Sequence, residues 1–167
     1  MIIKNLPKIF YINFLIVVFV YAIDRISKIY VIYLNKSNLG SDIYTSSYLN
    51  ITLIWNKGIA FGLFSFDKIY LYNLLSALIA VIILILVLMV YKNKGFKRYS
   101  LLIIIGGALG NLYDRIFYSG VPDFIDLHIG EFHWFIFNVA DIFITFGVIF
   151  MILSELIVTS DNQHEKN

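Results

Sequence analysis

The stretch Ile69–Tyr91, IYLYNLLSALIAVIILILVLMVY, contains no charged residue. A helix needs about 20 largely apolar residues to cross the hydrocarbon core of a bilayer, so this stretch predicts a transmembrane helix. The composition of the whole chain agrees with that prediction. Of its 167 residues, 60% are hydrophobic and 14% are charged, whereas soluble domains have about 45–50% apolar and about 25% charged residues. We therefore expect the chain to fold in a membrane.

Three further apolar stretches have the length of a membrane span. They lie at about residues 9–33, 99–117 and 134–156, and complement the span at 69–91. Four spans with short connections leave no room for a separate soluble domain, so we expect residues 1–167 to form a single integral membrane domain. The predicted fold class is an all-α membrane protein with four transmembrane helices.

The connections between these spans indicate how the chain is oriented in the membrane. Residues 92–98 carry four basic residues and no acidic one. Short loops rich in Lys and Arg stay in the cytoplasm, so we expect this link and both termini on that side. Residues 35–68 and 118–133 then lie outside. Apolar and polar residues alternate at 48–55, which predicts a small extracytoplasmic β-containing cap in the segment 35–68. The segment 118–133 is expected to include an interfacial amphipathic stretch.

Several classes of chemistry are excluded by what the chain lacks. It has no cysteine, and therefore neither a disulfide nor a thiolate nucleophile. A net charge of +2 is too small to suggest a nucleic-acid partner. His128 and His133 are five residues apart, which does not match the His-Glu-x-x-His spacing of zinc peptidases. We expect no metal and no cofactor.

Charged residues beside apolar spans are costly unless they are paired, hydrated or functional. Asp24 precedes Lys28 by four residues, so on a helix the two share a face and can form an ion pair. Asp114 and Arg115 end the third span. They can simply mark the membrane boundary, or Arg115 can hold a substrate carbonyl or a lipid phosphate.

Asp141 lies inside the fourth span, on which no basic residue can neutralise it. Asn138 is three residues earlier on the same helical face, and Asp123 follows the turn-like sequence 119–122, so the two carboxyl groups can meet at one depth. Two close carboxyl groups in a dry site cannot both ionise. One can take a proton from water while the other donates one to a peptide carbonyl. This pattern fits an aspartyl hydrolase, a proton- or cation-coupled transporter, or a structural role.

Two further patterns suggest close packing and a polar cavity. Gly106 and Gly110 are four residues apart, which lets a neighbouring helix approach the third span closely. Asn111 on the same apolar span is better explained by a polar cavity that it lines. The residues 56–62 form a small-residue loop that could lie over a cleft at membrane level.

Five short motifs, in their order along the chain, resemble those of one family: lipoprotein signal peptidase, or signal peptidase II, the bacterial intramembrane aspartyl protease. Together they extend over nearly the whole chain, and five in this order are far more specific than any one alone. The motifs are DRISK at 24–28, NKGIAF at 56–61, GGALGNLYDR at 106–115, VPDFID at 121–126 and FNVAD at 137–141.

The resemblance implies roles for particular residues. Asp123 and Asp141 would be the catalytic pair, and Asp126 only a near neighbour. A substrate pocket and a supporting polar set are implied as well. The pocket would be lined by Asn56, Gly58, Asn111, Arg115 and Asn138, while Asp24, Lys28 and Asp114 would hold the local architecture.

The resemblance also implies a substrate and a location. Such an endopeptidase removes the signal peptide of prolipoproteins by cutting before a diacylglyceryl-modified cysteine, with two aspartates activating one water. The expected location is the bacterial cytoplasmic (inner) membrane, with several spans and with the active site near the outer face. The expected partners are lipid-modified prolipoproteins and membrane lipids, with no nucleic acid, no cofactor and a monomeric protein.

Two positions depart from the family pattern. Pro122 stands where another apolar residue such as Val is expected, and Ile59 stands where the family usually has the smaller Ala. Proline fixes its own backbone angle and lacks an N–H donor, so the path of the chain into Asp123 is expected to differ slightly.

A small proton-coupled carrier is the alternative function. Asp141 would be its proton site, and Asn111, Asn138 and Arg115 would bind the solute. Such a carrier needs no partner at Asp123, and four short spans would have to dimerise to enclose a pathway. A third possibility is a purely structural helix bundle that packs through Gly106 and Gly110. It would not explain why a carboxyl group stands inside a span at Asp141.

Overall fold

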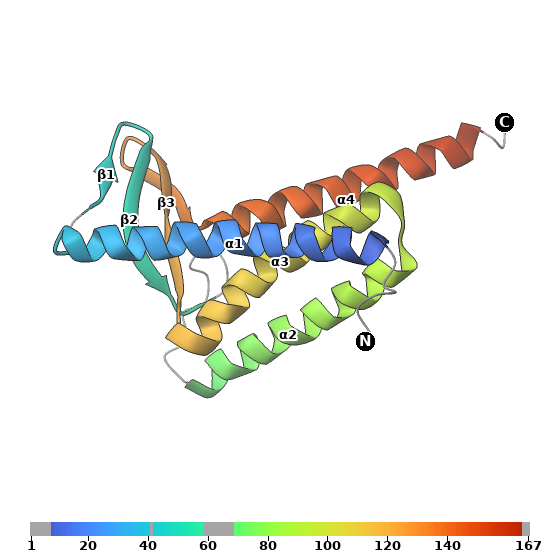
Figure 1. Ribbon diagram of the computed structural model, residues 1–167. Helices are drawn as coiled ribbons and strands as arrows, with labels where there is room; N and C mark the ends of the chain where they lie inside the picture. The colour runs from blue at the N-terminus through green and yellow to red at the C-terminus, as the bar shows by residue number, and fades with distance from the viewer. Residues whose placement is uncertain (1–7, 41, 59–68, 165–167) are drawn as a thin grey trace.

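The computed structural model describes residues 8–40, 42–58 and 69–164. Four helices form a bundle with a small sheet at one end (Figure 1). All four are long and apolar enough to cross a membrane, which confirms the predicted four-span fold. The helices are α1 (Lys8–Ser37), α2 (Ile69–Lys92), α3 (Gly95–Tyr118) and α4 (Val139–His164).

The fourth span begins later than predicted. The apolar run from 134 was assigned to a helix, but its first residues belong to strand β4 (Phe132–Phe137), and α4 starts only at Val139. Aromatic and β-branched residues suit a strand as well as a buried helix, so apolar content alone could not place this boundary. Helix α3 starts earlier than the predicted residue 99, and only Asn93 and Lys94 separate it from α2.

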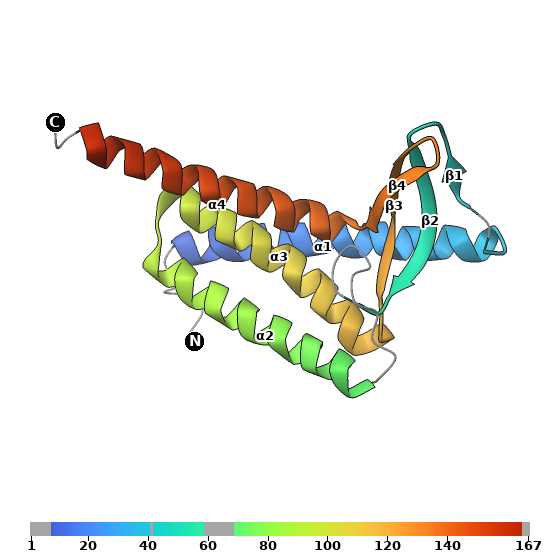
Figure 2. The same cartoon turned by 180° about the vertical axis from the view of Figure 1, so that it is seen from behind.

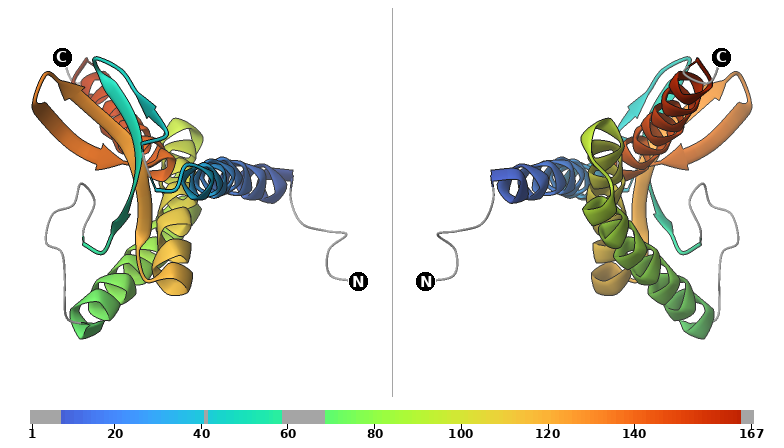
Figure 3. Two further views of the ribbon diagram at one scale, coloured as in Figure 1. Left: turned by 90° about the vertical axis from the view of Figure 1, so that its left-hand side faces the viewer. Right: turned by 90° about the vertical axis from the view of Figure 1, so that its right-hand side faces the viewer.

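Helix α3 is the centre of the bundle. The end-on views of Figure 3 show α1, α2 and α4 arranged around it, and it packs against all three. In its most apolar window 56% of the residues are buried, against 11–17% in the other helices. The outer helices therefore direct most of their apolar side chains away from the protein, as a bilayer environment permits.

Glycines on α3 and α4 allow this close packing. A Cβ atom at Gly106 would lie 2.7 Å from Val20 Cβ of α1, and one at Gly110 would collide with the Asp24 carboxylate. The predicted close approach at these two glycines is confirmed. Gly107 is equally tight on the other side of α3, where a Cβ atom would lie 2.7 Å from the backbone oxygen of Ala140 in α4.

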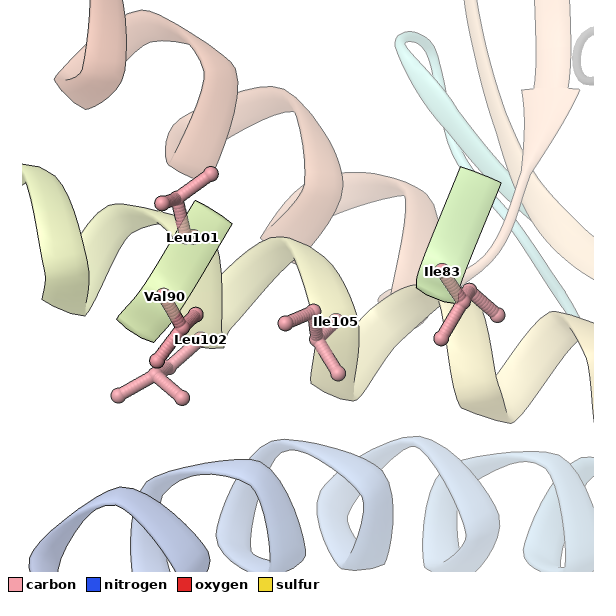
Figure 4. Packing of buried hydrophobic residues seen from close by; sticks show 5 residues of the cluster. All are labelled: Ile83, Val90, Leu101, Leu102 and Ile105. Atoms are coloured by element: carbon pink, nitrogen blue, oxygen red, sulfur yellow. The ribbon is translucent and has the colours of Figure 1, made fainter. Parts of the chain in front are cut away.

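The apolar core lies between α2 and α3. Figure 4 shows its five buried members, which come from these two helices. They are Ile83 and Val90 of α2, and Leu101, Leu102 and Ile105 of α3.

The sheet has four antiparallel strands, β1 (Tyr44–Thr45), β2 (Leu49–Asn56), β3 (Val121–Ile129) and β4, in the order β1-β2-β3-β4 (Figure 2). The first two form part of the predicted β-containing cap. The predicted outer loop at 118–133 is instead strand β3, which forms a hairpin with β4 through a turn at Gly130 (φ 58°). The expected amphipathic stretch is this hairpin, because alternating side chains and a glycine turn suit a strand pair.

Pairing of β2 with β3 sets the position of Asp123. Asp123 lies opposite Ile54, after an irregularity in the register between Ile51 and Ile54. Pro122 pairs with Trp55, and β4 pairs with β3 only from Ile125 onward. The missing N–H of Pro122 is therefore on a part of β3 that β4 does not reach, which explains how the strand accommodates it. Residues 59–62 of the predicted loop, with Ile59, lie outside the described residues.

Candidate active site

Asn138 and Asp141 form a reciprocal cap at the start of α4. The Asp141 N–H donates to Asn138 Oδ1 (3.2 Å), and the Asn138 N–H donates to Asp141 Oδ2 (3.1 Å). This is the geometry of a capping box, here in the sequence Asn-Val-Ala-Asp. It holds the Asp141 carboxyl group in the first turn of the helix, where the exposed N–H groups favour a negative charge.

Asp123 reaches the same place from strand β3. Its Oδ1 accepts a hydrogen bond from Asn138 Nδ2 (2.6 Å), and its Oδ2 accepts one from Asn56 Nδ2 (2.8 Å). Asn138 therefore contacts both aspartates. Its side-chain amide binds Asp123, and its backbone N–H binds Asp141 as part of the helix cap. Asn56 is itself held, because its Oδ1 accepts the Gly58 N–H (2.8 Å).

Burial makes Asp123 a proton acceptor at near-neutral pH. The residue is only 3% exposed. Loss of solvent raises the pKa of Asp123 from 3.8 to about 6, and the nearby Asp141 contributes in the same direction. The hydrogen bonds from Asn138 and Asn56 oppose the rise without cancelling it. The carboxyl group can thus hold or release a proton in the pH range where a hydrolase works.

The two aspartates line a cavity of about 590 Å³ between α2, α3 and α4. Most of its wall is apolar and comes from these helices, with residues such as Leu78, Ile82 and Ile149. The polar residues that line it are Asn56, Asn111, Arg115, Asp123, Asn138, Asp141 and Thr145. A cavity of this kind fits an apolar chain that carries one polar reacting group.

Asn111 and Arg115 connect α3 to this site. Asn111 Nδ2 donates to Asp141 Oδ1 (2.9 Å), and Arg115 Nη2 donates to the backbone oxygen of Gly58 (2.6 Å). The Arg115 guanidinium lies 5.6 Å from the ring centre of Tyr72. Tyr72 was not among the predicted residues, since nothing in an apolar span distinguishes this tyrosine from those that face lipid.

A second group of buried charges lies next to the site. The predicted pair of Asp24 and Lys28 is confirmed at 2.9 Å. Asp114 does not form a boundary pair with Arg115. It binds Lys28 (2.7 Å) and Arg25 (2.6 Å), and Arg25 also binds Asp24 (3.0 Å). Arg25 was not assigned a role from the sequence, although its place beside Asp24 in a span was the available signal.

Asp24 joins this group to the active site. Its Oδ1 accepts the backbone N–H of Ala140 (3.0 Å), in the first turn of α4. Asp126 points elsewhere, because it binds His133 Nδ1 (2.8 Å) and Asn50 Nδ2 (3.3 Å) on the sheet. Within residues 8–40, 42–58 and 69–164, no three His, Asp or Glu side chains lie close enough together to hold a metal ion.

The chain as a whole is similar to proteins of one family. The family model for signal peptidase (SPase) II matches residues 16–157. The lipoprotein signal peptidase of Pelagibacter ubique (strain HTCC1062) is 51% identical over 160 residues, 96% of each chain. That of Anaplasma phagocytophilum (strain HZ) is 48% identical over 141 residues, 82% of this chain and 86% of its own. A solved bacterial membrane enzyme has a TM-score of 0.72 and 32% identity, with 89% of this chain and 90% of that chain covered.

Proposed function

Since the chain belongs to the signal peptidase II family, we propose that it removes the signal peptide from prolipoproteins by cutting before the diacylglyceryl-modified cysteine. One observation carries the chemical part of this proposal. Two buried aspartates, joined through Asn138, meet at the polar end of an apolar cavity. An apolar signal peptide suits such a cavity, and its scissile bond would lie beside the carboxyl groups.

The reaction is a hydrolysis by two aspartates and one water. One carboxylate takes a proton from the water as its oxygen attacks the scissile carbonyl carbon, and the protonated partner donates to the carbonyl oxygen. The C–N bond then breaks, the proton taken from water passes to the leaving nitrogen, and the former carbonyl oxygen returns its proton to the partner aspartate. The raised pKa of Asp123 supports a shared proton, because a fully ionised pair could supply only bases.

The pocket residues would hold the substrate around this pair. Arg115 is buried, and its Nε and Nη1 have no hydrogen-bond partner among the described residues. These N–H groups can donate to carbonyl oxygens of a bound peptide or lipid. Asn56, Gly58, Asn111 and Asn138 would hold the pair and shape its surroundings.

The arrangement in the membrane follows from charge and shape. The basic link between α2 and α3 lies at the end of the bundle opposite the sheet (Figure 1). With that link in the cytoplasm, both termini would be cytoplasmic, and the aspartates would lie near the outer face of the bacterial inner membrane. A lipid-modified substrate could then reach the cavity from the bilayer. We propose that the protein acts as a monomer in contact with membrane lipids.

The carrier with Asp141 as its proton site loses its basis. The matching relatives are signal peptidases, and a carrier offers no reason for Asp123 to share Asn138 with Asp141.

The test is cleavage of a diacylglyceryl-modified prolipoprotein by the purified protein in detergent, with EDTA present. Wild type should cut, and Asp123→Asn and Asp141→Asn should not, because an amide of nearly the same shape cannot transfer the proton. Asp126→Asn is the matched control, since Asp126 binds His133 on the sheet and should leave cleavage intact. Wild-type turnover in Asp123→Asn, with the fold verified by circular dichroism, would refute the two-aspartate mechanism.

A further inference from the structure

The amide of Asn111 is fixed in one orientation by Lys28. Asn111 Oδ1 accepts a hydrogen bond from Lys28 Nζ (2.8 Å), and Asn111 Nδ2 donates to Asp141 Oδ1 (2.9 Å). An asparagine side chain has one accepting end and one donating end. With an ammonium group on the oxygen, only the NH₂ group can face Asp141.

Lys28 uses all of its donors in this arrangement. An ammonium group has three N–H bonds. They point to Asp24, Asp114 and Asn111, at 2.9, 2.7 and 2.8 Å. The side chain is fully buried, so no water replaces any of these partners. Its third donor is therefore committed to the group that touches Asp141.

The two aspartates of the active site differ in what surrounds them. Asp141 lies in the first turn of α4, and its oxygens accept one backbone N–H and the Asn111 amide. Each of these favours the ionised form. Asp123 lies in strand β3, so no helix N-terminus favours its negative charge. Burial raises the pKa of Asp123 to about 6. Of the two carboxyl groups, Asp141 is the one that the Asn111 amide contacts.

The charged groups around Asp141 come from three elements. Asp24 and Lys28 of α1 act on it electrostatically with opposite signs, and Asp123 of β3 shares Asn138 with it. Arg115 of α3 lines the same cavity. Asp24 is itself paired with Arg25 and Lys28, which offsets its repulsion of Asp141.

We propose that Lys28 is a positioning residue that orients the Asn111 amide toward Asp141 and so stabilises the ionised form of Asp141. This inference rests on the proposed two-aspartate function. It gives Lys28 a role in the reaction in addition to neutralising Asp24 and Asp114.

Arg25 provides a matched control within the same group. It binds the same two aspartates as Lys28, and none of its hydrogen bonds among the described residues reaches Asn111. The test compares Lys28→Met/Asp114→Asn with Arg25→Met/Asp114→Asn. Each double variant removes one cation and one anion, so both keep the charge balance, and only the first removes the donor to Asn111.

The measurement is kcat/KM for prolipoprotein cleavage as a function of pH. The acidic limb of this profile reports ionisation of the base in the free enzyme. The Lys28 double variant should move that limb upward by about one pH unit and leave the alkaline limb in place. Without Lys28 the Asn111 amide is no longer held with its NH₂ group toward Asp141, and a carboxylate that loses a hydrogen-bond donor is harder to ionise. The Arg25 double variant should keep both limbs at the positions they have in Asp114→Asn alone.

A second variant keeps the test decisive if the Lys28 double variant does not fold. Asn111→Ser removes the link to Asp141 while the four charges stay in place, and it should move the acidic limb in the same direction. Equal profiles for the Lys28 and Arg25 variants, or an unmoved limb in Asn111→Ser, would overturn the role of Lys28. Such results would leave the two-aspartate function standing, whereas failure of wild type to cleave would remove that function itself.

Discussion

Two pairs of buried aspartates lie next to each other and are stabilised in opposite ways. Asp24 and Asp114 are held by the cations Arg25 and Lys28. Asp123 and Asp141 are held by amide and backbone N–H groups from Asn56, Asn111 and Asn138. The first pair is electrically balanced, and the second is not.

The difference determines which pair can exchange protons. A buried carboxylate beside a cation keeps its charge, because removing that charge would leave the cation unpaired in a dry site. An amide satisfies the hydrogen bonds of a carboxyl group without cancelling its charge, so protonation remains accessible. We therefore expect the cation-held pair to support the architecture and the amide-held pair to carry out the chemistry.

The largest expected effect comes from the amide-held pair. Asp123→Asn and Asp141→Asn should each reduce cleavage by about 10³-fold or more, because general acid–base groups contribute about 10²–10⁴-fold and the two act together. The measurement is the initial rate of prolipoprotein cleavage in detergent. A residual rate within tenfold of wild type in either variant would show that the pair does not carry the reaction.

The same Asp-to-Asn exchange in the cation-held pair should act on stability instead. Asp114→Asn leaves Arg25 and Lys28 with one carboxylate, and loss of one partner from a buried ion pair costs about 3–5 kcal/mol. We expect a clear drop in the midpoint of thermal unfolding in detergent, which Asp123→Asn should not show. An equal drop in both variants would contradict the distinction between the pairs.

The pH dependence of stability sharpens the comparison. The pKa of Asp123 is raised to about 6 from 3.8, so its favourable protonated state is fully present below about pH 4 and is lost as the pH rises through 6. At 1.36 kcal/mol per pKa unit the loss is on the order of 3 kcal/mol. Wild type should become less stable between pH 4 and pH 7.

Asp123→Asn is the control for this pH effect, because an amide does not titrate. Its unfolding midpoint should change less with pH than that of wild type over the same interval. A variant whose midpoint follows the wild-type curve in parallel would mean that another group causes the pH dependence.

A smaller effect is expected from a substitution at Gly107, where the backbones of α3 and α4 are in close contact. A Cβ atom at Gly107 would lie 2.7 Å from the Ala140 oxygen, so Gly107→Ala should displace the start of α4, with a cost of about 1–3 kcal/mol and a reduced cleavage rate. Gly120→Ala is the control, since the nearest atom there is 3.5 Å away. Unfolding midpoints and cleavage rates of the two variants check this, and indistinguishable results would argue against the close packing at Gly107.

Several features could be predicted from the sequence because they depend on neighbours along the chain. Apolar length predicted the four spans, and a spacing of four residues predicted the pair of Asp24 and Lys28. The order of five motifs along the chain indicated the family. The hairpin at 121–137 was missed. Strand β3 was expected as a loop, and the residues of β4 from 134 onward are apolar enough to be assigned to the helix that follows.

The sequence by itself determined the membrane environment, the helices and the family, since a helix of fixed rise and period brings residues three and four apart to one face. Only the tertiary structure decided that Asp114 binds Arg25 and Lys28, that Lys28 reaches Asn111, and that Asn138 contacts Asp123. These contacts join separate segments, up to 89 positions apart. They exist because glycines let α1 and α4 approach α3 closely, and spacing along one chain does not report the distance between two packed helices.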